Sequence, residues 1–112
     1  MSAPVLNRKL VLERPETAPD GAGGLMPGWV TAGTLWARIE AGSGRARGEN
    51  GVPLSRVPLK ITVRAQPPGH PMRPVPGQRF REGERRYAIL AVADRDSSAR
   101  YLTCHAEEEG AR

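Results

Sequence analysis

The chain has 112 residues and a formal net charge of +5 at pH 7, and it contains thirteen glycines, eleven prolines and one cysteine. A lone Cys104 excludes an intrachain disulfide, and no apolar run reaches the roughly 18 residues of a membrane helix, so we expect no membrane partner. The length predicts one domain over residues 1–112, and the glycine and proline content argues against long helices.

The first part of the chain contains two predicted strands. Residues 6–14 alternate between apolar and polar side chains with a period of two, which predicts a strand. Residues 15–28 (PETAPDGAGGLMPG) have the composition of a loop. A second alternating stretch then predicts a strand that begins near Trp29 and ends near Glu40.

A long loop separates the second predicted strand from the third. Residues 42–58 contain four glycines and two prolines and show no sustained periodicity. Loops longer than about 12–15 residues inside a compact domain are usually functional or disordered. Residues 59–65 (LKITVRA) alternate most cleanly and predict the third strand, and residues 66–77 are dense in proline and predicted to be extended.

The last third of the chain predicts two or three further strands. Residues 78–81 form a short strand, and the apolar run in residues 85–95 predicts a strand that is covered on both faces. Residues 99–109 alternate again, and a flexible acidic tail is expected over about residues 107–112. The prediction is an all-β fold: a small β-barrel or sandwich of five to six mostly antiparallel strands.

The positive charge is concentrated in the middle of the chain. Residues 41–81 contain eight bases and one acid, whereas the flanking residues are neutral or acidic in sum. Three of these bases, Arg45, Arg47 and Arg56, lie on the long loop, and two interpretations stay open: contact with DNA phosphates, or a solvated or protein-contacting loop. No base-reading motif is present, so any DNA contact should be independent of sequence and sensitive to salt.

Other charged residues suggest contacts between subunits. Lys60 and Arg64 share one face of the third predicted strand, which is either a solvent face or the basic half of an interface. The remaining candidates for a subunit interface are Arg79, Arg81, Glu82, Glu84, Asp94 and Asp96. A basic middle and acidic ends suit head-to-tail contacts in a closed ring.

Catalytic and metal-binding patterns are not found. Cys104 and His105 are adjacent on a predicted strand and therefore point to opposite faces, and no Cys-x-x-Cys or His-x-x-x-His spacing occurs. The DGAGG sequence at 20–24 lacks the Lys-Ser/Thr of a phosphate-binding loop. We expect no enzymatic activity, metal or cofactor, and we interpret Trp29 and Trp36 as core or interface anchors.

The order of these elements resembles the phage head–tail joining family of small head-closure, or stopper, proteins. The matching segments are LNRKLVLERPE, then DGAGG followed by a Trp and WVTAGTLWARIE, then LKITVRA. The closing hairpin, ERRYAILAVADRD followed by RYLTCHAEE, is the most family-like part. The proline-dense residues 66–77 depart from the family pattern.

The resemblance implies a β-barrel that assembles as a homo-oligomeric ring between a portal or adaptor ring and the tail terminator or tail proteins. Such a ring closes the DNA exit channel and offers a docking surface to the tail, with six-fold or twelve-fold symmetry by analogy. The implied location is the virion of a tailed phage or a gene transfer agent, after assembly in the bacterial cytoplasm. An alternative stays open: a monomeric nucleic-acid-binding barrel of the OB or SH3-like kind.

Overall fold

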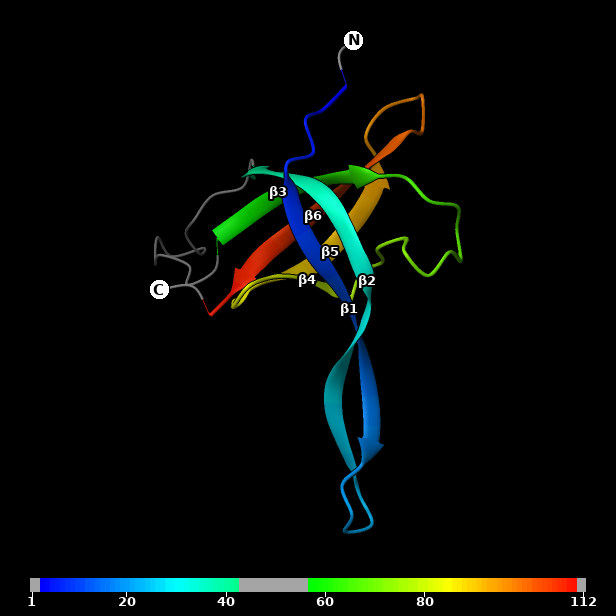
Figure 1. Cartoon of the computed structure of the whole chain (residues 1–112), viewed down its shortest axis with the longest axis vertical. Helices are drawn as coiled ribbons and strands as arrows, with labels where there is room; N and C mark the ends of the chain where they lie inside the picture. Colours follow the sequence, from blue (N-terminus) through cyan, green and yellow to red (C-terminus); the bar gives the residue numbers. More distant parts are fainter. Residues whose placement is uncertain (1–2, 43–56, 111–112) are drawn as a thin grey trace, which may run out of the picture.

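The computed structural model describes residues 3–42 and 57–110, and within these ranges six β-strands close into an antiparallel barrel (Figure 1). The strands are β1 (Arg8–Pro19), β2 (Leu25–Ala41), β3 (Val57–Arg64), β4 (Arg79–Glu82), β5 (Arg85–Asp94) and β6 (Tyr101–Glu109). Their order around the barrel is β1-β2-β3-β6-β5-β4, and β4 pairs back with β1. The predicted all-β fold of five to six antiparallel strands is confirmed.

The barrel core consists of the inward-facing residues of the alternating strands. Leu10 and Leu12 of β1 are fully buried, as are Phe80 of β4 and Tyr87 of β5. The rest of the core is Ala37, Ile61, Val63, Ile89, Leu102, Cys104 and Ala106. Because successive side chains of a strand point to opposite faces, the period of two found in the sequence places these residues inside.

β1 and β2 continue beyond the barrel as a two-stranded ribbon, which we call the arm (residues 14–30; Figure 1). The strands pair from Arg14↔Val30 to Pro19↔Leu25, so the loop predicted over residues 15–28 is wrong except at its turn. The ribbon buries neither face, and its sequence therefore needs no apolar alternation. Prolines are tolerated because each strand of a two-stranded ribbon has an unpaired edge.

The turn at the tip of the arm is built by Asp20 and two glycines. Oδ1 of Asp20 accepts hydrogen bonds from the backbone N–H groups of Ala22 at 2.8 Å and Gly24 at 3.0 Å. Gly21 and Gly23 have φ values of 83° and 85°, a region that glycine adopts without steric cost. The DGAGG sequence is thus a hairpin turn.

A register shift marks the point where the arm leaves the barrel. Leu12 pairs with Gly33 and Glu13 pairs with Thr31, which leaves Ala32 as an extra residue on β2. Such a bulge bends the strand and increases its twist. The ribbon therefore turns away from the barrel and extends the molecule to 55 Å in its longest dimension.

The proline-rich segment between β3 and β4 is a series of turns, and the predicted extended conformation is wrong. Pro74 is buried, and the N–H of His70 donates to the carbonyl of Pro67 at 3.0 Å. Met72 packs over Gly33 so closely that a Cβ on this glycine would lie 2.5 Å from the sulfur. Local turn hydrogen bonds explain why proline does not extend this segment.

Two predicted boundaries and one predicted face also change. β3 begins at Val57, so the predicted 42–58 loop is shorter, and its residues 43–56 lie outside the described part of the chain. β6 runs to Glu109, so the tail expected from residue 107 is strand to that point, because it pairs with β5 and β3. On β5, Leu90 is 53% exposed at a bulge, so this strand is not covered on both faces.

Candidate assembly surface

A cluster of charged side chains from β1, β4 and β6 lies at the root of the arm. Nε of Arg79 donates to Oε1 of Glu13 at 2.7 Å, and Nε of Arg81 donates to Oε2 at 3.0 Å. Glu109 lies 3.6 Å from Arg79. Burial alone would raise the pKa of Glu13, but the hydrogen bonds from the two arginines outweigh it, and the pKa falls below its usual value. The ionised cluster joins three strands.

Trp29 of the arm covers this cluster. Cζ of Arg79 lies 4.0 Å from the centroid of the Trp29 ring, well within cation–π range. The guanidinium is therefore stacked and hydrogen-bonded at once, which fixes the arm to the barrel. Trp29 is 39% exposed, so its predicted core position is wrong, while its role as an interface anchor stays a prediction.

A second charged group links β1, β4 and β5. Arg8 makes a bidentate pair with Glu82, with N···O distances of 2.5 and 2.7 Å, and the Tyr87 hydroxyl donates to the same carboxylate at 3.0 Å. The Arg8 hydrogen bond holds the pKa of Glu82 below its usual value. Burial, together with this carboxylate, raises the pKa of Tyr87 to about 12.

The structure divides the predicted interface residues into two groups. Arg79, Arg81 and Glu82 have partners within their own chain, as described above. Lys60, Arg64, Glu84 and Asp94 are exposed, while Asp96 is partly exposed and accepts a hydrogen bond from the N–H of Ser98 at 2.9 Å. These residues do not form one patch, since Glu84 and Asp94 flank opposite ends of β5. Their role in a subunit interface stays a prediction.

The three arginines predicted to meet DNA, Arg45, Arg47 and Arg56, lie outside the described residues. In the described ranges, no three His, Cys, Asp or Glu side chains converge on a metal-binding position, and no helix could cross a membrane. Cys104 is buried and His105 is exposed, on opposite faces of β6. Burial raises the pKa of the Cys104 thiol to about 12.

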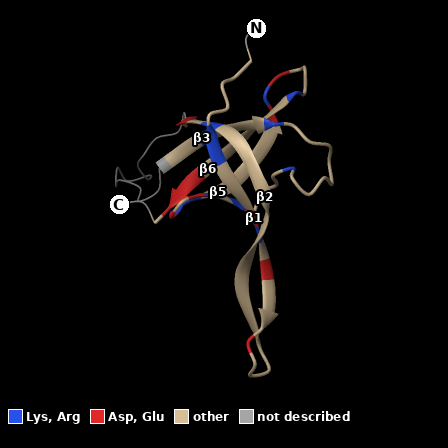
Figure 2. Cartoon of the chain, viewed as in Figure 1, with Lys and Arg blue, Asp and Glu red and all other residues tan. Residues whose placement is uncertain are grey.

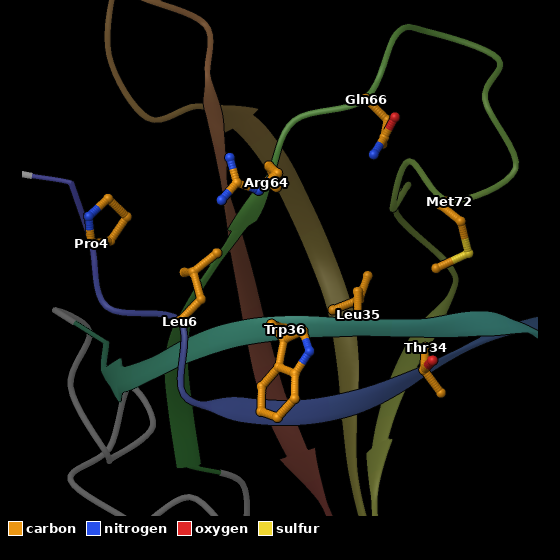
Figure 3. Close-up of a pocket in the computed structure, with 8 residues that line it drawn as sticks. All are labelled: Pro4, Leu6, Thr34, Leu35, Trp36, Arg64, Gln66 and Met72. Atoms are coloured by element: carbon orange, nitrogen blue, oxygen red, sulfur yellow. The ribbon is translucent and has the colours of Figure 1, made fainter.

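A pocket of about 570 Å³ opens on the outer face of the barrel (Figure 3). Its walls come from the N-terminal segment, β2, the end of β3 and the proline-rich segment. The lining residues are Pro4, Leu6, Thr34, Leu35, Trp36, Arg64, Gln66 and Met72. Trp36 is 55% exposed, so its predicted core position is wrong, while its role as an interface anchor stays a prediction. The pocket is mostly apolar and carries one cation, Arg64.

The arm presents an apolar face. Cross-strand partners share a face of a ribbon, so the pairs of Pro15 with Trp29 and Pro19 with Leu25 lie on the same side. The face consists of Pro15, Thr17, Pro19, Leu25, Pro27 and Trp29, without a charge. The opposite face carries Met26, which is 56% exposed, and Glu16. Figure 2 shows two acidic positions along the arm, and at its root Arg14 lies 4.0 Å from Glu16.

Sequence reasoning missed both the arm and the pocket. A signal for the arm was present, because the turn-forming DGAGG is flanked by two stretches of equal length, residues 14–19 and 25–30, that a hairpin can pair. The pocket had no comparable signal. Its walls come from four segments that only the closed barrel brings together.

Comparisons with known proteins identify the family. The family model of the phage head completion protein matches residues 1–109. A solved chain described as "Virion of native gene transfer agent (GTA) particle" is 50% identical, with a TM-score of 0.79, over 98% of this chain and 100% of that chain. No curated protein matches. The monomeric nucleic-acid-binding barrel is not favoured, and the resemblance to head-closure proteins is confirmed. The chain belongs to the phage head completion family, whose members are structural proteins of head closure.

Proposed function

We propose that this protein forms a ring between the portal or adaptor ring and the tail of a phage or phage-like particle. The ring closes the DNA exit channel and gives the tail its docking surface. The observation that supports this is the 50% identity to a chain of a gene transfer agent virion, over nearly all of both chains. A match over both full lengths favours the same place in a related particle.

The closed barrel constrains how copies associate. Each barrel strand pairs with a neighbour on both sides over part of its length, so the described barrel offers a neighbouring chain only short stretches of open edge. We therefore expect contacts between copies to use side chains, loops and the arm more than strand pairing. Among the exposed charges, the basic Lys60 and Arg64 of one copy could pair with the acidic Glu84 and Asp94 of the next copy. We expect six-fold symmetry, with twelve-fold as the alternative.

The proposal includes contact with packaged DNA. Arg45, Arg47 and Arg56 follow β2 in a glycine-rich segment, and a ring would present one copy of this segment from every subunit. Repeated weak phosphate contacts add up through multivalency. The contact would be independent of sequence and would weaken as salt rises.

The test is a gene deletion in the organism that produces the particles, complemented with the wild-type gene. Particles made without the protein should have heads that lack tails or have lost DNA. Complementation should restore tailed, DNA-filled particles. The purified wild-type particles should contain the protein at the junction in an electron-microscopic reconstruction. Tailed, DNA-filled particles at wild-type yield after deletion would contradict the proposed function.

A further inference from the structure

The arm has a large unpartnered apolar surface. Leu25 is 69% exposed and Met26 is 56% exposed, and they occupy opposite faces of the ribbon near its tip. A two-stranded ribbon is marginally stable alone, so an arm of this length gains order from a binding surface. Burying a large apolar side chain stabilises a contact, which makes these two side chains suitable anchors.

The pocket beside Trp36, which we call the Trp36 pocket, is concave where the arm protrudes, and like the arm it is mostly apolar. Leu6, Leu35 and Met72 line it beside the exposed Trp36 ring, and its volume of about 570 Å³ is large enough for anchor side chains. Figure 3 shows Leu6 on the N-terminal segment and Trp36 on β2, with Arg64 and Gln66 on the end of β3 and the segment that follows it. Apolar anchors with a polar rim are typical of protein interfaces.

The charges of the two surfaces are complementary. The arm contains Glu16 and Asp20 and one base, Arg14 at its root, which lies 4.0 Å from Glu16, so the charge near the tip is that of Asp20. The residues that line the pocket include Arg64 and no acid, and the exposed Lys9 is the cross-strand partner of Trp36. An acidic tip near a basic rim favours approach in one orientation.

The arm cannot reach the pocket of its own chain. Trp36 pairs with Lys9 near the start of β1, whereas the arm begins at Arg14 and runs away from the barrel. In Figure 1 the arm and the N-terminal segment leave the molecule at opposite ends. A contact between arm and pocket therefore requires a second copy.

We propose that the arm of one copy docks its Leu25 and Met26 end in the Trp36 pocket of the next copy. The two surfaces differ, so the contact is heterologous and repeats head to tail, which closes a ring when the rotation allows it. The proposal rests on the proposed function, because it specifies how that ring is held together. In this arrangement the contact between Arg79 and Trp29 sets the direction in which the arm leaves the barrel.

Crosslinking in purified particles tests this contact. The variant Leu25→Cys/Gln66→Cys places one thiol on the arm and one at the pocket rim. Treatment with a short bis-maleimide should give a ladder of this chain that extends beyond the dimer. The native Cys104 is buried and should not interfere.

The matched control is Leu25→Cys/Leu90→Cys. Leu90 is exposed like the pocket residues, but it lies on β5, across the barrel from β2. This control should give no ladder. Dimers alone from the test variant would indicate a symmetric contact and overturn the proposal. A crosslink to a different particle protein would show that the arm binds another ring and would also overturn it.

Crosslinking and gene deletion together distinguish a failure of the arm–pocket contact from a failure of the proposed function. If the test variant yields tailed, DNA-filled particles but no ladder, the arm–pocket contact is wrong and the head-closure ring stands. If deletion of the gene leaves normal particles while the protein still forms the ladder, the contact stands and the proposed function is wrong.

Discussion

The guanidinium of Arg79 lies between the indole of Trp29, at 4.0 Å from the ring centroid, and the carboxylate of Glu13, at 2.7 Å. One side chain of β4 thus contacts β2 within the arm and β1 at the residue before the arm begins. A ribbon attached only through its two backbones would be free to swing about the bulge at Ala32. The stacked and paired arginine restricts that motion.

We expect Arg79→Ala to destabilise the protein and loosen the arm. Its loss leaves Glu13 buried with fewer partners, at a cost of about 2 kcal/mol in the free energy of unfolding. Urea denaturation measures the loss, and hydrogen exchange should increase in residues 14–30. Arg86→Ala, at an exposed position of β5, is the control and should change stability by less than about 0.5 kcal/mol. Unchanged exchange in the arm of Arg79→Ala would contradict the role of Arg79.

Acid should destabilise the fold through its paired carboxylates. Glu13, Glu82 and Glu108 have pKa values below the usual 4.5, so the folded chain binds fewer protons than the unfolded chain in acid. Their stabilisation is present above about pH 4.5 and is lost as the pH falls through the lowered values. Denaturation between pH 7 and pH 3 measures this, and Glu13→Gln should reduce the slope. A free energy of unfolding that is flat down to pH 3 would refute the prediction.

The thiol of Cys104 should be inert in the folded protein. It is buried in the core, and burial raises its pKa to about 12, so little thiolate exists at neutral pH. We expect no reaction with a maleimide over hours at pH 7 and complete reaction in denaturant, as measured by mass spectrometry. Rapid native labelling would show that the barrel opens between β6 and its neighbours.

Gly33→Ala should move the proline-rich segment. The new Cβ would lie 2.5 Å from the Met72 sulfur, so Met72 must shift, with an expected loss of about 1 kcal/mol. Met72→Ala removes the obstacle, so the double variant should lose less stability than the sum of the two single variants. Strict additivity in the denaturation data would show that the two residues do not interact.

Leu25→Asp should impair assembly without affecting folding. The side chain is 69% exposed in the single chain, so its stability should change by less than about 0.5 kcal/mol. The charge would have to be buried in the proposed pocket, and a loss of about 1.4 kcal/mol per contact lowers affinity tenfold. We expect at least a tenfold drop in tailed particles by electron microscopy. Leu90→Asp is the matched control, and equal loss in both variants would argue against the arm.

Most barrel strands could be predicted because burial of one face imposes alternation. Leu10 and Leu12 show this in β1, and Leu102 and Cys104 show it in β6. The arm had no such pattern, since a ribbon exposed on both faces imposes none. Composition alone therefore made residues 15–28 look like a loop.

The charged contacts could not be predicted from blocks of charge along the sequence. Arg8 and Glu82 are 74 positions apart, and Arg79 and Glu13 are 66 apart. Barrel closure between β1 and β4 brings them together. Part of the basic excess of residues 41–81 is thereby neutralised by an acid of the N-terminal flank, which a segment-by-segment charge count does not detect.

The prolines of the arm have a consequence for the time between synthesis and assembly. Pro15, Pro19 and Pro27 have no backbone N–H, so the ribbon's outer edges offer fewer donors to a passing strand. Uncontrolled sheet growth from these edges is one route by which concentrated β-proteins precipitate. Because the described barrel leaves only short open edges and the ribbon has blunted ones, we expect newly made subunits to resist this route to fibrils.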